Sequence, residues 1–562
     1  MSRVGALHGP DTTRFACLSN VSPLPAGDGR PMNGPSDRRQ IAFGIQASPA
    51  QLVWATLLLG AAVRLAVAAV LGLGVDESYT VANARSLQWS YYDHPPLSFW
   101  IVHATVWLTG SEANPVVRLP FIALFALTGW LLYRLGSVLF SPWAGAWAAV
   151  LANLAPIYTI AFGGWILPDG PLLAAMLASA LCLVGLLQAG KDCRPARRWA
   201  LALGAGLFLG LACLAKYHGF LFGAGIALFL ATSPRHRHWL VRPETWAAGL
   251  VALAVFSPVL IWNAQNDWIS IAFQAGRAAA REDPKPQQAL VAVLGQILYL
   301  GPWIWLPLVW AVARSVRAGP RDEGAWFLFW AGLLPILIFT LTPLWGSRGL
   351  PHWQAPGYIF WLPLLGRAMT AWWPAPPATG RRGARWWLGL AAAALLLAVP
   401  VLASHAATGW AGRAFPALFA KGDPTHEGLD WTDLHDWLAA RGDLDQPDLF
   451  VGVWHWIDAG KVDAALGGRL PVAVLTADPR NFAFQHDLSA FAGRDAILVG
   501  RERTERGWVD RYRPHFREIE PLGEICVSRA GHCEVPLKAY LGRGYKGDFP
   551  LPFGPSAATG SR

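Results

Sequence analysis

The sequence predicts an α-helical membrane protein that crosses the bilayer about eleven times and carries a small α/β domain after its last span. The first observation is composition: hydrophobic residues make up 54% of the 562 residues and charged residues only 15%. An ordinary soluble protein has about 25% charged residues. The second is a series of apolar runs near the ~20 residues that cross ~30 Å of hydrocarbon as a helix. The third is a shift to a polar, mixed composition after residue 406.

Residues 1–48 are rich in Pro, Gly, Ser, Asp and Arg and show no apolar period, so we expect a disordered cytoplasmic tail there. Residues 49–406 follow as the predicted transmembrane domain. Two of its spans are short and are joined only by KYHG, but a single merged helix would be too long. The eleven spans are expected at residues 51–71, 116–139, 143–162, 170–189, 199–215, 219–231, 246–262, 289–313, 325–344, 356–373 and 386–406.

The loops between these spans differ in positive charge. With the N-terminal tail in the cytoplasm, the inner loops hold fifteen Lys and Arg residues and the longer outer loops hold six. Cytoplasmic loops of membrane proteins accumulate Lys and Arg. We therefore expect a membrane protein with a cytoplasmic N-terminus and an extracytoplasmic C-terminus. The same rule explains the net charge of +10, so the excess requires no nucleic-acid partner.

Residues 407–545 are expected to fold as an α/β domain in the extracytoplasmic space. The runs LFVGVW, LPVAVL and AILVG are typical of short buried strands, and THEGLDWTDLHDWLAARG is typical of a helix. Cys526 and Cys533 are seven residues apart, which favours a disulfide bridge if this end faces an oxidising compartment. Residues 546–562 are expected to form a second disordered tail.

Acidic residues gather in the outer loops of a chain that is otherwise poor in acids. Asp76 and Glu77 follow the first span, Asp93 lies in the same loop, and Asp169 stands in a Pro-Asp-Gly sequence before the fourth span. A carboxylate at the bilayer surface is placed to act as a base toward a lipid-borne substrate. The alternative is structural: Asp76 and Glu77 cap an interfacial helix, and Asp169 is a turn residue and helix cap.

The outer loops also carry a series of motifs in a fixed order, namely DESY, YYDHPPL, LPDGPLL, LAKYHGF, LIWNAQNDW and LPHWQAP. With this series, residues 51–370 resemble the bacterial glycosyltransferase family 39-like proteins. These are relatives of the protein O-mannosyltransferases, the lipid A aminoarabinose transferases and the rhizobial lipopolysaccharide galacturonosyltransferases. DESY alone would carry little weight, whereas the ordered series is specific. Both predicted tails and the C-terminal domain lie outside the resemblance.

The resemblance implies a GT-C fold in the bacterial inner membrane and an enzyme that moves a sugar from a polyprenyl-phosphate donor to a hydroxyl acceptor at the outer leaflet. Asp76 matches the acid proposed as the general base of this family, and Glu77 matches its partner. Asp169 matches the acid of the second outer loop, which shapes the donor and acceptor site. The acceptor stays open among lipid A or lipopolysaccharide, another glycan and a protein, and the sugar stays open as well.

The resemblance further implies residues that bind substrate. Tyr92, Asp93 and His94 match a site-forming segment of the family. Lys216 matches the lysine of a Ser-Lys-Tyr motif, which reads Ala-Lys-Tyr in this chain. His352 stands where many relatives have Asn.

Residues of these types fit the chemistry of sugar transfer. A sugar joined through C1 to a phosphate reacts when a base deprotonates the acceptor hydroxyl and a cation stabilises the phosphate leaving group. Asp76 supplies a carboxylate, and the candidate cations are Lys216, Arg277, Arg348 and His352. Their alternative role is to snorkel toward lipid phosphates. The sequence shows no glycine-rich nucleotide loop, dinucleotide fingerprint or Cys/His metal cluster, so we expect a lipid donor and no required cofactor, and we leave a divalent metal ion open.

The main alternative function is a polytopic transporter or flippase for lipids or sugars. Such a protein places ionisable residues at mid-membrane, whereas the acids here gather at one surface. An O-antigen ligase or polymerase performs similar chemistry but does not fit the motif order, and a non-catalytic scaffold is the remaining alternative. An enzyme requires Asp76 and Asp169 to converge on one outward-facing site, and its partners would be the donor, the acceptor and membrane lipids.

Overall fold

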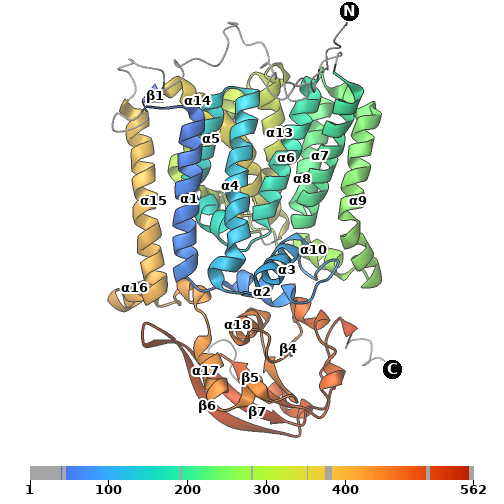
Figure 1. The fold of residues 1–562 in the computed structure, drawn as a ribbon, viewed down its shortest axis with the longest axis vertical. Coiled ribbons are helices and arrows are strands. Elements are labelled where there is room, and N and C mark those ends of the chain that lie inside the picture. The colour runs from blue at the N-terminus through green and yellow to red at the C-terminus, as the bar shows by residue number, and fades with distance from the viewer. Residues whose placement is uncertain are drawn as a thin grey trace, which may run out of the picture.

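The computed structural model describes residues 39–40, 46–189, 193–279, 283–347, 349–350, 352–373, 382–501 and 507–555. A bundle of long helices forms one part, and a domain with a five-stranded sheet packs against one end of it (Figure 1). The chain enters the bundle at the opposite end. The predicted tail over residues 1–48 lies outside the described residues, except for Ser48 and two short paired strands, β1 (Arg39–Gln40) and β2 (Gln46–Ala47).

Every predicted span falls on helical structure. The helices of the bundle and its loops are α1 (Pro49–Val70), α2 (Val75–Ala84), α3 (Leu97–Thr109), α4 (Asn114–Leu139), α5 (Pro142–Asn153), α6 (Asp169–Gln188), α7 (Pro195–Ala215), α8 (His218–Thr232), α9 (Pro243–Gln265), α10 (Ile269–Ala278), α11 (Pro286–Leu300), α12 (Pro302–Val316), α13 (Glu323–Leu341), α14 (Ala355–Trp372) and α15 (Arg382–Thr408). Among the described residues, seven of them are long and apolar enough to cross a membrane: α1, α4, α6, α7, α9, α13 and α15. The total of eleven crossings stays a prediction.

The predicted span at 289–313 is wrong as a single helix. It consists of α11 and α12, which meet at an angle of 110° and count as an eighth crossing only if they form one broken span. The break falls at Gly301, whose φ is +82°, and at Pro302 directly after it. Glycine adopts positive φ without steric cost, and proline has no N–H with which to continue the helix of α11.

Small residues let the bundle helices approach one another closely. A Cβ atom on Gly332 of α13 would overlap the backbone of Gly357 on α14. A Cβ atom on Gly206 of α7 would overlap the backbone of Ala248 on α9. Inside a membrane, helices associate through such close van der Waals packing, because lipid tails are as apolar as the side chains.

The C-terminal part is an α/β domain, as predicted. Its elements are α16 (Trp410–Ala414), α17 (Thr432–Ala440), β3 (Leu449–Val453), α18 (Trp456–Leu466), β4 (Val472–Val474), β5 (Asp495–Gly500), β6 (Glu518–Arg529) and β7 (His532–Arg543). The strand order is β4-β3-β5-β7-β6, with β4, β3 and β5 parallel and β5, β7 and β6 antiparallel. The three apolar runs predicted as strands are β3, β4 and β5, and every residue of β3 and β4 is buried.

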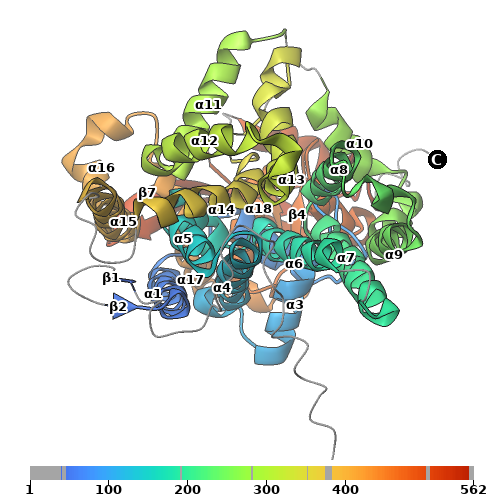
Figure 2. The same cartoon turned by 90° about the horizontal axis from the view of Figure 1, so that it is seen from above.

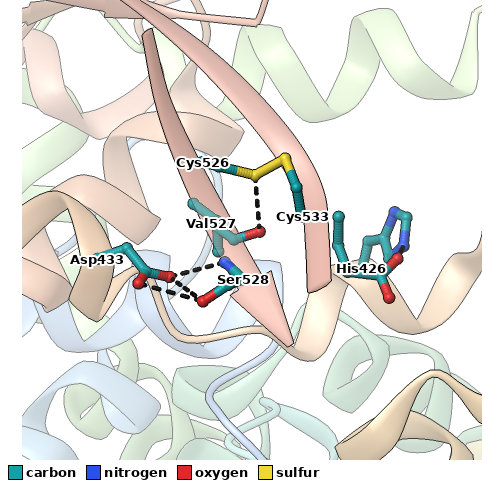
Figure 3. The surroundings of a disulfide bond; sticks show 7 residues. His426, Asp433, Cys526, Val527, Ser528 and Cys533 are labelled. Atoms are coloured by element: carbon teal, nitrogen blue, oxygen red, sulfur yellow. Dashed lines mark hydrogen bonds and ion pairs between the residues drawn. A yellow bond between two sulfur atoms is a disulfide. The ribbon is translucent and has the colours of Figure 1, made fainter. Parts of the chain in front are cut away.

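A hairpin of two twelve-residue strands, β6 and β7, closes the sheet. Cys526 on β6 and Cys533 on β7 are joined by a disulfide across this hairpin (Figure 3), which confirms the predicted pair. Asp433 of α17 accepts hydrogen bonds from the backbone N–H of Ser528 at 2.7 Å and from its hydroxyl at 2.9 Å. The hairpin is therefore linked both across its own strands and to the helix beside it.

The predicted C-terminal tail is wrong for residues 546–555, which pack against the rest of the protein. Leu551 is buried, and the ring of Phe553 stacks on that of Tyr92 with 4.3 Å between centroids. Residues 546–554 form no helix or strand, but their apolar side chains are placed against the rest of the protein. Residues 556–562 lie outside the described part of the chain.

The α/β domain docks on the bundle through α2, which lies with α3 between the two parts (Figure 1). Gly460 of α18 allows this close approach, because a Cβ atom there would lie 2.8 Å from the backbone nitrogen of Tyr79. The neighbouring Lys461 is buried and donates hydrogen bonds to the carbonyl oxygens of Leu73 and Leu429. The first loop of the bundle is thus in close contact with α18 of the C-terminal domain.

Candidate active site

The described residues predicted for the site lie at the end of the bundle that faces the C-terminal domain. Figure 2 looks down the bundle from its other end and shows the domain behind the helices. Four segments far apart in the sequence contribute: the loop with α2, the start of α6, the connection between α7 and α8, and the loop before α14. All lie outside or at the ends of the long helices.

Asp76 stands in the first turn of α2, and its side chain is exposed. Its carboxylate makes no hydrogen bond or ion pair with any described residue. Protein nevertheless surrounds this carboxylate and removes much of its hydration, and the negative charges of Asp93 and Glu427 act in the same direction. These effects raise the pKa of Asp76 to about 6. A base with a pKa near the working pH is both ionised and basic enough to accept a proton.

The adjacent Glu77 is buried, and its carboxylate is fully hydrogen-bonded. Oε1 accepts from Arg118 Nε at 2.7 Å and from the Ile166 N–H at 3.0 Å. Oε2 accepts from Arg118 Nη2 at 2.6 Å and from the Gly74 N–H at 2.7 Å. Glu77 thus fixes the first turn of α2 to α4 and to the loop before α6. Arg118 was missed because it lies inside a predicted span, although a charge in a span is itself a sign of a buried partner.

Asp169 and Lys216 form a buried ion pair. Lys216 Nζ lies 3.0 and 2.9 Å from the two carboxylate oxygens, and the two residues are only 3% and 8% exposed. Asp169 is the first residue of α6, directly after the N-cap residue Pro168. Lys216 ends α7 in an extended conformation, which directs its side chain toward α6. The role of a simple turn residue or helix cap does not account for this arrangement of Asp169.

The C-terminal domain supplies a cation, Arg480, to the acidic side of the site. Tyr79 donates a hydrogen bond to Asp93 Oδ1 at 2.8 Å, and Arg480 Nη1 lies 3.9 Å from Asp93 Oδ2. The guanidinium of Arg480 lies over the rings of Phe273 and Trp456, 4.8 Å from each centroid. Its φ of +52° is unusual for a residue other than glycine and costs about 1 kcal/mol or more. No motif marks Arg480, because it lies outside the region of family resemblance.

Tyr92 is held by the same domain. Its N–H donates to Asn481 Oδ1 at 3.0 Å, and the N–H of Asn481 donates to the hydroxyl of Tyr79 at 3.1 Å. The ring of Tyr92 contacts Phe273 of α10 at 4.8 Å and Phe553 at 4.3 Å between centroids. Tyr92 is therefore a packing residue where the two parts of the protein meet. Asn481 also carries no sequence signal that would have identified it.

Two histidines lie near the ion pair, and both are neutral near pH 7. Burial lowers the pKa of His94, and the charges of Lys216 and Asp169 both act on it. Burial lowers the pKa of His352 to about 4, and the charge of Lys216 lowers it further. A neutral His352 does not supply a cation near pH 7, and its role in binding substrate stays a prediction. A neutral imidazole still offers one N–H to a phosphate oxygen.

The other predicted cations differ in what the structure describes. Arg277 lies near the end of α10, and its guanidinium is 4.8 Å from the ring centroid of Trp353. Arg348 lies outside the described residues. In the described ranges, no group of three or more His, Cys, Asp or Glu side chains is arranged to hold a metal ion.

The segment of Asp93 and His94 joins two chemically different halves of the site. On one side, the charge of Asp93 acts on the exposed carboxylate of Asp76. On the other side, His94 lies within the electrostatic influence of the Asp169–Lys216 pair. An exposed carboxylate and a buried, positioned cation thus act on the same two residues. Such an arrangement is able to accept a proton on one side and to stabilise an anion on the other.

Comparisons with known proteins agree with the motifs. Residues 93–262 match the family model described as dolichyl-phosphate-mannose-protein mannosyltransferase. A curated relative is the lipid A galacturonosyltransferase RgtD of Rhizobium johnstonii, which is 28% identical over 293 residues. That match covers 51% of this chain and 58% of the relative, so the chain spans little more than half the length of RgtD.

The fold is similar to that of ArnT from Cupriavidus metallidurans. The apo structure of ArnT has a TM-score of 0.60 at 16% identity, over 87% of this chain and 98% of that chain. The structure bound to undecaprenyl phosphate has a TM-score of 0.56 at 15% identity, over 87% and 97%. These similarities confirm the GT-C fold. Together with the family match, they confirm the resemblance of this chain to the GT-C membrane glycosyltransferases.

Proposed function

We propose that the protein is a membrane glycosyltransferase that moves a sugar from a polyprenyl-phosphate donor to a hydroxyl acceptor on the extracytoplasmic face. The observation that carries this proposal is that an exposed carboxylate, Asp76, and a buried ion pair, Asp169–Lys216, lie at the same end of a GT-C fold and both act on the segment of Asp93 and His94. The names of the matched proteins support it: RgtD is a lipid A galacturonosyltransferase, and one ArnT structure holds undecaprenyl phosphate. Lipid A is therefore the first acceptor to test, before another glycan or a protein.

In this mechanism Asp76 removes the proton of the acceptor hydroxyl. The acceptor oxygen then forms a bond to C1 of the sugar while the bond from C1 to the phosphate oxygen breaks. The electron pair of that bond stays on the polyprenyl phosphate, and the proton stays on Asp76. Lys216, positioned by Asp169, and the N–H of neutral His352 are the groups that stabilise the departing phosphate. Glu77 acts by positioning α2 and not by proton transfer.

The expected orientation places this site outside the cytoplasm of a bacterium, in the inner membrane. The charge difference between the loops supports it, as does the disulfide in the C-terminal domain, since disulfides persist in oxidising compartments. A transporter is the less favoured alternative. The described acids and cations of the site lie at the domain end of the bundle, whereas a transporter needs its ionisable residues along a central path.

The test is sugar transfer by the purified full-length protein in lipid nanodiscs. A synthetic polyprenyl-phosphate sugar is supplied with lipid A, and the product is identified by mass spectrometry. We expect a glycosylated acceptor and free polyprenyl phosphate in equal amounts. The contrary result is a protein that, in vesicles, moves the donor across the bilayer without forming a product. This result would contradict the proposal and favour the transporter.

Activity should depend on pH through the raised pKa of Asp76. Above pH 6 the carboxylate is ionised and able to accept a proton, and below pH 6 it is protonated and inactive. The acidic limb of kcat/KM should therefore bend at about pH 6 and fall about tenfold per pH unit below it. Initial rates between pH 4.5 and 8 measure this profile. A limb that bends near pH 4, the range of an ordinary carboxyl, would show that a different acid is the base.

A further inference from the structure

A groove of about 210 Å³ lies in the half of the bundle that points away from the C-terminal domain. Its walls come from α6, α7, α8 and α9 and from the turn Arg237–Val241 between α8 and α9. The walls are almost entirely apolar, with leucines, alanines and glycines as the main lining residues. Ala227 of α8 and Gly249 of α9 line it and are exposed, so the groove opens between these two helices toward the hydrocarbon.

The polar end of this groove holds a buried carboxylate, Glu244, in the first turn of α9. Glu244 is only 3% exposed. One of its oxygens, Oε1, lies 3.5 Å from Nη2 of Arg198 on α7. The other, Oε2, has no hydrogen-bond partner among the described residues, and neither does the buried Nε of Arg198. Buried polar atoms are nearly always hydrogen-bonded, and Glu244 lines the groove, so this end of the groove offers one free acceptor.

The unpartnered oxygen of Glu244 defines the charge of a ligand. A positively charged N–H group satisfies Glu244 Oε2. This group must belong to a molecule with an apolar chain, since the rest of the groove is apolar and opens to lipid. The helix dipole of α9 and the contact with Arg198 explain why an acid is tolerated here, but they leave Glu244 Oε2 unpaired.

We propose that the groove binds one phospholipid with a primary-amine headgroup, of the phosphatidylethanolamine type, from the leaflet opposite the candidate active site. One acyl chain lies along the apolar walls, and the ammonium donates to Glu244 Oε2. A choline headgroup has no N–H to donate, and a glycerol headgroup carries no positive charge. The site therefore discriminates among phospholipids by headgroup. This inference goes beyond the proposed glycosyl transfer and does not depend on it.

The test is native mass spectrometry of the full-length protein titrated in detergent with phosphatidylethanolamine, phosphatidylcholine or phosphatidylglycerol. The wild type should retain phosphatidylethanolamine about tenfold better than the other two, as expected for one additional charge-assisted hydrogen bond. Glu244→Gln should lower this retention to the level of phosphatidylcholine. Glu323→Gln is the matched control, because Glu323 lies in the first turn of α13, pairs with Arg235 and His236, and does not line the groove.

A second variant tests the apolar part of the groove. A Cβ atom on Gly249 meets no other atom within 4 Å, so Gly249→Leu should fill the groove without strain and reduce retention of all three lipids. Equal retention of phosphatidylethanolamine and phosphatidylcholine by the wild type would overturn the proposal, since water would then suffice to satisfy Glu244. An unchanged preference in Glu244→Gln would overturn it as well. If Glu244→Gln does not fold, the comparison of headgroups in the wild type and the result for Gly249→Leu still test the proposal.

Discussion

Replacing Asp76 by Asn is expected to slow sugar transfer by about 10²–10⁴-fold, the usual contribution of a general base. Asn keeps the size of the side chain, but its amide cannot take the proton of the acceptor hydroxyl. The Asp76 carboxylate is exposed and has no hydrogen-bond partner among the described residues, so the variant should unfold at the same temperature as the wild type. Initial rates with a synthetic donor, at matched amounts of protein in nanodiscs, measure the effect.

The matched control for this variant is Glu427→Gln. Glu427 is exposed, and its charge contributes to the raised pKa of Asp76. Removing that charge should shift the acidic limb of the pH profile to lower pH and leave the rate at pH 8 unchanged. Full activity of Asp76→Asn would show that the base is elsewhere, and Asp169 would be the next acid to test.

The second large effect is expected for Lys216→Ala, which leaves Asp169 buried without its cation. Breaking a buried ion pair by removing one partner costs about 3–5 kcal/mol of stability. Both carboxylate oxygens of Asp169 lie 2.9–3.0 Å from Lys216 Nζ, so the variant loses both of these hydrogen bonds. We expect a clear drop in the unfolding temperature and little remaining transfer activity. Thermal unfolding in detergent and the transfer assay, on the same preparation, measure the two effects.

A double variant separates the structural role of the pair from its role in the reaction. Asp169→Leu combined with Lys216→Met removes both charges and keeps similar volumes, and such replacements are often neutral for stability. The double variant should unfold at about the temperature of the wild type and remain inactive, because no cation is left for the phosphate. An active double variant would mean that the pair serves the fold alone.

The control for the cost of breaking a buried pair is Arg235→Ala. This variant breaks an exposed pair with Glu323 and should change the free energy of unfolding by less than about 1 kcal/mol.

The helical part of the fold was readable from the sequence because apolar length alone specifies a membrane helix. The pattern failed where the cause is local: Gly301 and Pro302 break one run into two helices at a sharp angle. Strands β3, β4 and β5 were readable because they are buried, unbroken apolar runs. The hairpin of β6 and β7 was not predicted from the sequence, because polar residues alternate along it and several of them face solvent.

The site was predictable only as far as its motifs reach. Asp76, Asp169 and Lys216 lie in motif segments, and the pairing of the last two depends on how α6 and α7 pack, which one sequence does not reveal. Arg480 and Asn481 come from the other domain and contact the first loop across nearly 400 residues of chain. Contacts over such a separation leave no periodicity or spacing in a sequence. The resemblance made Glu77 the partner of Asp76, and the ion pair that Glu77 forms with Arg118 does not follow from the motif.

The stacking of Phe553 on Tyr92 has a consequence for when the protein becomes active during its synthesis. The ribosome makes Tyr92 early and Phe553 more than 450 residues later, after every bundle helix. If the expected orientation holds, the first loop waits outside the membrane until the last strands have been translocated and folded around it. An incompletely exported chain would carry every acid of the motif series and still lack the surface that positions them. Secretion of the C-terminal domain would then act as the final maturation step.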